Sequence, residues 1–163
     1  MMEIFAKPCA GAIIEKIIDG EKHILLQTRQ KSGGGDTNGK LELPAGKIRE
    51  YESIFTALRR EVFEETGLTV TKIKNENKLF SKFVGDFETI SAEPFCVTQN
   101  LSGAYSIILL TFVCEADGDL LESTDETQNI RWVNADFVRR MLLDEPEKFF
   151  FIHLNALKKY FKI

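Results

Sequence analysis

One stretch, residues 46–68, constrains the fold of this chain more than any other. It reads GKIREYESIFTALRREVFEETGL, and its centre has the periodicity of an amphipathic helix about four turns long. Ser53 stands where an N-cap residue begins a helix, and Gly67 stands where a left-handed residue ends one. Strand-like segments flank the stretch on both sides, so the sequence predicts a mixed α+β fold with a partly antiparallel sheet between helices.

The predicted helix has an apolar side and an acidic edge. Its apolar residues recur at helical spacing: Ile54, Phe55, Leu58 and Val62. Glu61, Glu64 and Glu65 share an arc beside them, where like charges repel and a purely structural helix would gain from Lys or Arg. Carboxylate oxygens suit hard divalent cations such as Mg²⁺, so the acidic edge predicts a metal site. A solvated acidic surface is the alternative.

The spacing across the whole stretch favours the metal site. Its signature positions are Gly46, Glu52, Arg60, Glu61, Glu64, Glu65 and Gly67. At these positions the chain resembles the complete Nudix box, in the form found in MutT-like members of the Nudix hydrolase family. The resemblance implies the Nudix α/β/α sandwich with a mixed sheet. It also implies a metal-dependent hydrolase that cleaves the diphosphate bond of a nucleoside diphosphate linked to another moiety.

The resemblance further implies a role for each acidic residue of the box. Glu61 and Glu65, one turn apart, are expected to bind one metal ion together. Glu64 is expected to bind a second ion or to act as the general base. A backbone carbonyl from Ala45 or Gly46, just before the box, would add a ligand. The expected cofactor is Mg²⁺ or Mn²⁺.

Two arginines and one further glutamate are expected to support these ligands or the substrate. Arg60 is four residues before Glu64 and, across the turn, within reach of Glu52, so Arg60 and Glu52 are expected to orient the carboxylates. Arg29 ends the second strand of a predicted N-terminal hairpin, where it would meet a substrate phosphate. A surface ion pair is the alternative for Arg29.

A fourth acid is expected to face the box helix from a loop near the C-terminal end. Glu126 stands six residues before Trp132, at the head of a short predicted strand. This position resembles that of the loop acid in other family members, which implies a further metal ligand or the general base. Glu122 and Asp125 in the same loop are the alternatives.

Composition limits the partners of the chain. A net charge of −4 offers no basic stripe to a nucleic-acid backbone, so we expect a small nucleotide-type substrate and no polymeric nucleic acid. No segment has the length of a membrane span, and the three cysteines have no CxxC spacing, so we expect one cytoplasmic domain over residues 1–163. A last predicted helix, Glu147–Lys162, carries an apolar stripe that docks on the core or joins two copies in a homodimer.

The substrate is the least determined part of this interpretation. Glu42-Leu-Pro-Ala-Gly46 before the box resembles the branch of the family that acts on ADP-ribose and nucleotide sugars. The proline that often follows the box in that branch is missing, since the next proline is Pro94. Nucleoside triphosphate pyrophosphohydrolysis, as in MutT-like pool sanitation, is therefore the alternative. A non-catalytic module that binds a nucleotide and regulates a partner is a third, and the intact acidic box argues against it.

Overall fold

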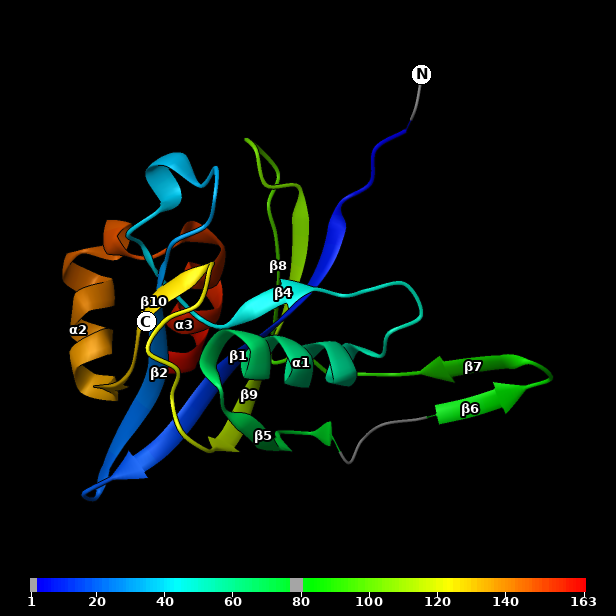
Figure 1. Cartoon of the computed structure of the whole chain (residues 1–163), viewed down its shortest axis with the longest axis horizontal. Coiled ribbons are helices and arrows are strands. Elements are labelled where there is room, and N and C mark those ends of the chain that lie inside the picture. Colours follow the sequence, from blue (N-terminus) through cyan, green and yellow to red (C-terminus); the bar gives the residue numbers. More distant parts are fainter. Residues whose placement is uncertain (1–2, 77–80) are drawn as a thin grey trace.

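The computed structural model describes residues 3–76 and 81–163 (Figure 1). In chain order its strands and α-helices are β1 (Lys7–Ile18), β2 (Glu21–Arg29), β3 (Leu41–Glu42), β4 (Ala45–Lys47), α1 (Ile54–Thr66), β5 (Thr69–Ile73), β6 (Ser81–Val84), β7 (Phe87–Ile90), β8 (Cys96–Gln99), β9 (Ile107–Asp117), β10 (Thr127–Asn134), α2 (Ala135–Asp144) and α3 (Leu154–Phe161). Short 3₁₀ turns join several of them.

A mixed sheet forms the centre of the fold, in the order β10-β2-β1-β9-β5. β1 and β2 form the predicted antiparallel hairpin, and Asp19 and Gly20 in its turn have positive φ angles of 50° and 81°. β9 runs parallel to β1, with Lys7 opposite Ile107, and it pairs antiparallel with β5 and β8. β4 pairs with β1, and β3 pairs with β2. The prediction of a mixed, partly antiparallel sheet is confirmed.

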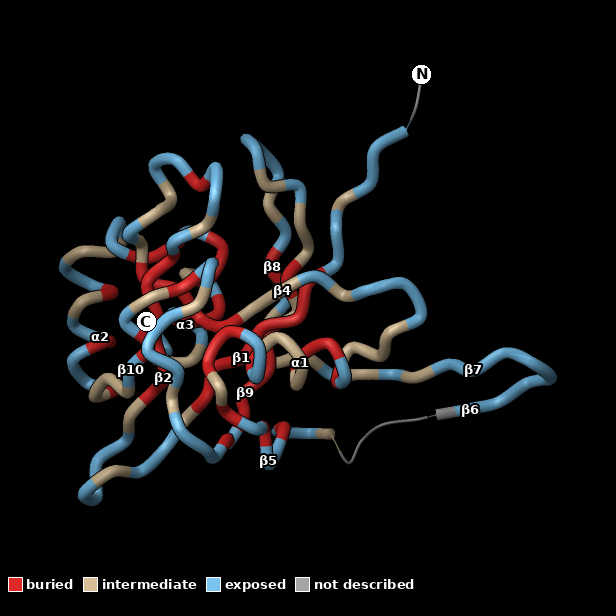
Figure 2. The backbone as a smooth tube through the Cα atoms, viewed as in Figure 1, coloured by how far each residue is buried: buried red, intermediate tan, exposed pale blue. Residues whose placement is uncertain are grey.

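The helices cover both faces of this sheet. Side chains alternate between faces along β1 and β9, so Ala12 and Phe112 join Leu58 of α1 in one buried cluster. Their neighbours Ile13 and Val113 point the other way and join a second cluster with residues of α2 and α3. Figure 2 shows these buried segments running through the middle of the molecule, between the exposed helix surfaces. The predicted α/β/α sandwich is confirmed.

The local signals around α1 act as the sequence predicted. The Ser53 side chain accepts a hydrogen bond from the Thr56 backbone N–H, and Ser53 itself is extended. Gly67 ends the helix at φ 80°, a left-handed conformation in which glycine carries no Cβ penalty. A Cβ at Gly67 would also lie 2.7 Å from the Asp119 carbonyl oxygen. Both ends of the helix are therefore set by residues of the box.

The predicted length of the last helix, Glu147–Lys162, is wrong, because the α-helix is shorter. Residues Pro146–Lys148 and Phe151–His153 form 3₁₀ turns, and the α-helix begins only at Leu154. Between the two turns the chain is extended: Phe149 lies opposite Leu41 of β3 in a parallel bridge, and the Phe150 N–H donates to the Leu41 carbonyl. This pairing buries both phenylalanines, and tertiary packing outweighs helix propensity here.

The other segments follow the predicted order with small differences. β6 and β7 form a separate two-stranded ribbon that projects from the body of the molecule (Figure 1). Of the predicted strand over residues 79–85, Leu79 and Phe80 lie outside the described residues. The apolar stripe of the C-terminal segment packs on the core, where Leu157 is fully buried. Within residues 3–76 and 81–163, no helix combines the length and apolar character that crossing a membrane requires.

Candidate active site

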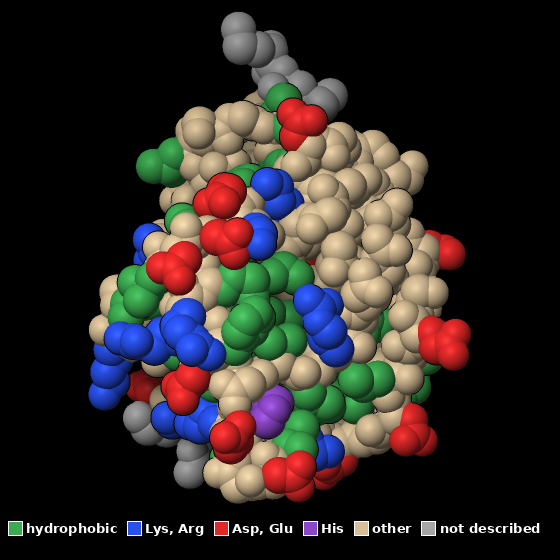
Figure 3. All heavy atoms as spheres, turned by 90° about the vertical axis from the view of Figure 1, so that its left-hand side faces the viewer, with side chains coloured by type: hydrophobic (Ala, Val, Ile, Leu, Met, Phe, Trp, Pro, Cys, Tyr) green, Lys and Arg blue, Asp and Glu red, His purple; other side chains and the backbone are tan. Residues whose placement is uncertain are grey.

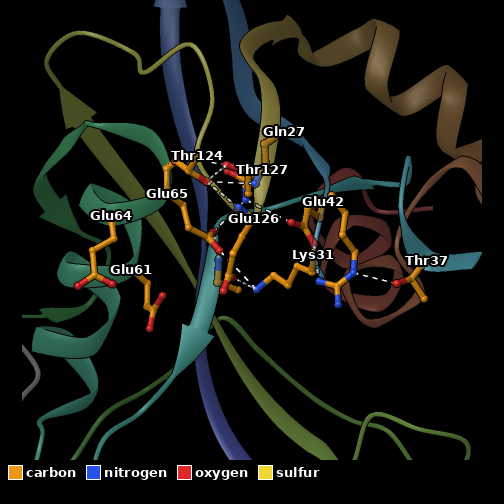
Figure 4. Close-up of polar contacts among 12 residues, drawn as sticks. Gln27, Lys31, Thr37, Glu42, Glu61, Glu64, Glu65, Thr124, Glu126 and Thr127 are labelled. Atoms are coloured by element: carbon orange, nitrogen blue, oxygen red, sulfur yellow. Dashed lines mark hydrogen bonds and ion pairs between the residues drawn. The ribbon is translucent and has the colours of Figure 1, made fainter. Parts of the chain in front are cut away.

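The acidic edge of α1 faces β4, the loop after β2 and the start of β10 (Figure 4). Glu65 is the buried member of this edge, with 5% of its surface exposed. Its Oε2 accepts hydrogen bonds from the Ala45 backbone N–H at 3.0 Å and from Gln27 Nε2 at 2.9 Å. Burial, with added repulsion from Glu42, raises the pKa of Glu65 to about 8. A cation that approaches the other oxygen, Oε1, would stabilise the charged form of this carboxyl group.

Glu61 packs directly against the backbone of β4. A Cβ built at Gly46 would lie 2.0 Å from Glu61 Cδ, so a side chain there would displace this carboxylate. Arg60 Nη1 donates to Glu61 Oε1 at 2.5 Å. The first glycine of the box thus leaves room for an acidic side chain against the strand.

Arg60 links the other carboxylates of the box. Its Nε and Nη2 donate to the two oxygens of Glu52 at 2.7 and 2.8 Å, and its Nη1 donates to Glu64 Oε2 at 3.2 Å. Its Nη2 also donates to the Lys47 carbonyl at 3.0 Å, which ties the helix to β4. Hydrogen bonds from Arg60 lower the pKa of Glu52 to about 2. The contacts expected between Arg60, Glu52 and Glu64 are present.

Glu64 is the open member of the acidic edge. Its side chain is 49% exposed, and Arg49 Nη2 lies 3.8 Å from its Oε1. In Figure 4, Glu65 points toward Lys31, whereas Glu61 and Glu64 lie apart from this pair along the helix. The three box carboxylates therefore lie along one edge of the helix, but they do not point to a common centre.

Lys31 lies between the carboxylates of Glu126 and Glu65. Lys31 Nζ lies 2.5 Å from Glu126 Oε2 and 3.8 Å from Glu65 Oε1. The next residue, Thr127, donates its hydroxyl to the Glu65 carbonyl at 3.3 Å, which fixes the start of β10 against the last turn of α1. Burial alone would lower the pKa of Lys31, but the contacts with Glu126 and Glu65 raise it.

Arg29 lies deeper than a surface ion pair or an open phosphate contact would require. Its Nη1 donates to Glu42 Oε2 at 3.2 Å, and both side chains are buried. The guanidinium carbon lies 4.3 Å from the centroid of the Phe150 ring, and Nε donates to Thr37 Oγ1 at 3.0 Å. Glu42 is thus the buried partner of Arg29. Its pKa is raised, chiefly by burial.

A largely apolar cavity of about 350 Å³ opens beside this buried pair. Its walls come from the loop after β2 and from the segment that precedes α3: Thr37, Lys40, Pro146, Glu147, Phe149, Phe150, Phe151 and Leu154. The loop after β2 contacts the acidic edge through Lys31, near its start, and lines the cavity with Thr37 and Lys40, near its end. The loop therefore connects the cavity with the carboxylates. The arrangement suits a ligand with one anionic part and one flat, apolar part.

Two residues of this site carry no motif and were missed by the sequence analysis: Gln27 and Lys31. Gln27 is fully buried in β2, where its amide nitrogen donates to Glu65 and, at 3.4 Å, to Glu42. A polar residue directly after the apolar run Ile24–Leu26 of a predicted strand was the available signal for Gln27. Lys31 had a weaker one, its place at the start of a glycine-rich loop.

The donor set fits a hard divalent cation. It consists of carboxylate oxygens from Glu61, Glu64, Glu65 and Glu126, which are the ligands that Mg²⁺ and Mn²⁺ prefer. In the described part of the chain, however, no three acidic, histidine or cysteine side chains are already close enough together to hold a metal ion. Arg60 and Lys31 occupy oxygens of these carboxylates instead.

Comparisons with known proteins identify a family and a shared fold. The NUDIX domain family matches residues 7–153. The NUDIX domain of Shewanella oneidensis NrtR, solved with ADP ribose, superposes with a TM-score of 0.69 at 16% identity, over 99% of this chain and 89% of that one. A MutT protein from Methanosarcina mazei Go1 gives 0.62 at 19% identity, over 99% and 97%. A C. elegans Ap4A hydrolase binary complex gives 0.54 at 14% identity, over 96% of each chain.

At these identities the solved structures establish a shared fold, and the family match establishes the relationship in sequence. That match covers the strands β1 to β10 and the helices α1 and α2, and it ends just before α3. It also contains the box, with its carboxylates held as described above. This chain belongs to the Nudix family of pyrophosphohydrolases.

Proposed function

We propose that this protein is a metal-dependent hydrolase that cleaves the diphosphate bond of a nucleoside diphosphate linked to another moiety. The observation that carries the proposal is the convergence of Glu65 and Glu126 on a single cation, the Lys31 ammonium, beside the intact acidic edge of α1. Hydrolysis of a diphosphate needs positive charge on its non-bridging oxygens and a base for the attacking water. This edge offers metal ligands for the first requirement and solvent-exposed carboxylates, Glu64 and Glu126, for the second.

In this proposal Glu61 and Glu65 hold the metal ion, with a backbone carbonyl of Ala45 or Gly46 as a further ligand. Mg²⁺ or Mn²⁺, when bound, would neutralise charge on the diphosphate. The buried donors on Glu65 Oε2, from Gln27 and Ala45, hold that carboxylate in one orientation. Its orientation is therefore set before any ligand arrives, which lowers the cost of assembling the site.

The proton of the attacking water passes to a carboxylate oxygen of Glu64 or Glu126. Both side chains are about half exposed, so water reaches either of them. Glu64 is also a candidate ligand for a second ion, in which case Glu126 is the base. Arg60 restrains Glu64 through its Nη1 and takes its own orientation from Glu52. Arg60 and Glu52 thus position the reacting groups without touching the substrate.

For the substrate we propose ADP-ribose or a nucleotide sugar. The segment before the box supports this choice, and so does the ADP-ribose bound to the related NUDIX domain of NrtR. The cavity next to Arg29 is apolar and rich in phenylalanine, as a pocket for a nucleobase or another flat group would be. In this proposal Arg29 either supports Phe150 in the cavity wall or breaks its ion pair with Glu42 to contact a substrate phosphate. Nucleoside triphosphates are the second candidate, supported by the MutT structures among the neighbours.

A small-molecule substrate fits the surface of the protein. On the face in Figure 3, basic and acidic side chains are interspersed around an apolar patch. The net charge of −4 does not favour binding to a nucleic-acid backbone. We propose no polymeric partner, and a homodimer stays a prediction that sedimentation can test.

The test is product release from ADP-ribose, nucleotide sugars, dinucleoside polyphosphates and nucleoside triphosphates, each with Mg²⁺, with Mn²⁺ and with chelator. Turnover of one class, abolished by chelator and by Glu64→Gln, supports the proposal and identifies the substrate branch. Metal-independent turnover would contradict the mechanism. Tight nucleotide binding with no turnover on any class would support the non-catalytic module instead.

A further inference from the structure

Lys31 places an ammonium group between two acidic side chains that come from different parts of the chain. Nζ lies 2.5 Å from Glu126 Oε2, in the loop before β10, and 3.8 Å from Glu65 Oε1, on α1. Figure 4 shows the extended lysine side chain reaching these two carboxylates from the loop after β2. The ammonium is the cation that lies between them.

The geometry of Glu65 puts this ammonium in the path of a metal ion. Oε2 already accepts two hydrogen bonds, from Ala45 and Gln27, so Oε1 is the oxygen turned toward the site. Lys31 Nζ is the group that Oε1 faces. A divalent ion binds carboxylate oxygens at about 2.0–2.2 Å, so an ion that joined Glu65 Oε1 to Glu126 Oε2 would need the space of the ammonium.

The backbone of Lys31 is held by three hydrogen bonds, and its side chain is partly exposed to solvent. Asn38 accepts a hydrogen bond from the Lys31 N–H and donates one to the Lys31 carbonyl, each at 3.0 Å. The Gly34 N–H donates to the same carbonyl at 2.9 Å. A Cβ at Gly34 would lie 2.2 Å from Asn38 Oδ1, so glycine permits this closure. The lysine side chain itself is 27% exposed, with solvent available to receive a displaced ammonium.

We propose that Lys31 is the resident counter-cation of the metal site, and that a divalent metal ion displaces its ammonium from Glu65 and Glu126. The inference rests on the proposed function for the identity of the ligand. Lys31 lies outside the box, and its role in this proposal is to hold the acidic side chains of Glu65 and Glu126 together before the metal binds. Since the metal must break these contacts, Lys31 lowers the apparent affinity for the metal.

The first test measures Mn²⁺ binding to the full-length protein by titration calorimetry, without substrate. Lys31→Met is expected to bind Mn²⁺ about tenfold more tightly than the wild type, because the competing charge is gone. Lys31→Arg keeps the charge and is expected to stay close to wild type. Lys72→Met is the matched control: it removes one lysine from the exposed ion pair with Glu115 on β5 and β9. That variant is expected to bind Mn²⁺ as the wild type does.

The second test uses the wild-type protein, so it does not depend on the folding of a variant. Reductive methylation, read by peptide mass spectrometry, is expected to label Lys31 faster when Mg²⁺ saturates the site, because the ammonium has left Glu126. Lys72 in the same samples serves as the internal reference and is expected to react at one rate throughout. Lys31 labelling that stays constant or slows on addition of Mg²⁺ would overturn the proposal.

The results separate this inference from the proposed function. A wild-type protein that binds Mn²⁺ with the same affinity as Lys31→Met, or more tightly, overturns the role of Lys31 and leaves the metal site standing. A wild-type protein that binds neither Mn²⁺ nor Mg²⁺ overturns the metal-dependent function and this inference with it.

Discussion

Arg60 holds Glu52 through two parallel hydrogen bonds, Nε to Oε1 at 2.7 Å and Nη2 to Oε2 at 2.8 Å, and this leaves Nη1 aimed at Glu61 and Glu64. One planar guanidinium thereby spaces three carboxylates of the box. An ammonium group is a point charge and cannot reproduce this fork. This pairing gives a structural reason for the presence of Glu52 eight residues before Arg60 in the box.

Arg60→Lys is expected to lower kcat about 10- to 100-fold while the protein stays folded, because the acidic side chains lose their spacing. Arg59→Lys is a matched control, since Arg59 is not a signature position of the box and also makes a bidentate contact with a glutamate, from Nη1 and Nη2 to Glu76 at 2.7 and 2.8 Å. Steady-state kinetics and thermal unfolding of both variants make the comparison. Equal losses of kcat in the two would show that the fork at Arg60 has no special part in catalysis.

Glu64→Gln is expected to leave the fold intact and to reduce turnover by about 10²–10⁴-fold, the range for loss of a general base or a metal ligand. Glu64 is half exposed and carries no core contact, so its replacement costs little stability. Glu115→Gln removes one exposed carboxylate from β9, far along the sheet, and should retain full turnover. A fully active, well-folded Glu64→Gln enzyme would transfer the role of base to Glu126.

Gly46→Ala is expected to weaken metal binding at least about tenfold by pushing the Glu61 carboxylate from its place against β4. The strain can be isolated by combining Gly46→Ala with Glu61→Ala, which removes the atoms that the new methyl group would meet. In the Glu61→Ala background the extra methyl should leave the melting temperature almost unchanged. If Gly46→Ala destabilises both backgrounds equally, contact with Glu61 is not the reason for the glycine.

His153 is expected to make the stability of the fold sensitive to mild acid. Burial lowers its pKa to about 3, whereas an unfolded histidine titrates near 6.5. Between these values the unfolded chain binds a proton that the folded chain does not, so stability is lost as the pH falls below about 6.5. The expected contribution is about 2 kcal/mol between pH 7 and pH 5, at about 1.4 kcal/mol per pH unit.

Urea unfolding at pH 7 and pH 5 measures this dependence in the wild type and in His153→Leu. The variant should lose the part of the slope that His153 supplies, and His23→Gln, on the partly exposed strand β2, should keep it. A slope unchanged in His153→Leu would assign the acid sensitivity to other groups.

Local signals in the sequence were sufficient to predict α1 and the β1–β2 hairpin. Ser53, Gly67 and the Asp19-Gly20 turn each act within a few residues of their own position, so pattern and propensity describe them well. The same holds for the box carboxylates, whose common edge follows from helical spacing alone. These features needed no knowledge of what lies across the fold.

The parts that sequence reasoning missed depend on contacts between distant segments. Phe149 and Phe150 read as the first turn of a helix, but they are drawn into an extended pairing with β3. Arg29 read as an exposed residue at a strand end, and only the approach of Glu42 from β3 and of Phe150 explains its burial. Lys31 has no spacing motif, because its partners lie on α1 and before β10.

The parallel pairing of β1 with β9 has a consequence for how the chain reaches its native state. Lys7 lies opposite Ile107, so the centre of the sheet joins two segments separated by most of the sequence. Closing so long a loop is entropically costly, which favours slow folding and a late-forming centre. During synthesis on the ribosome, α1 emerges well before β9, and its apolar side then lacks much of the surface it will cover. Nascent chains that stop before residue 107 are therefore expected to engage chaperones.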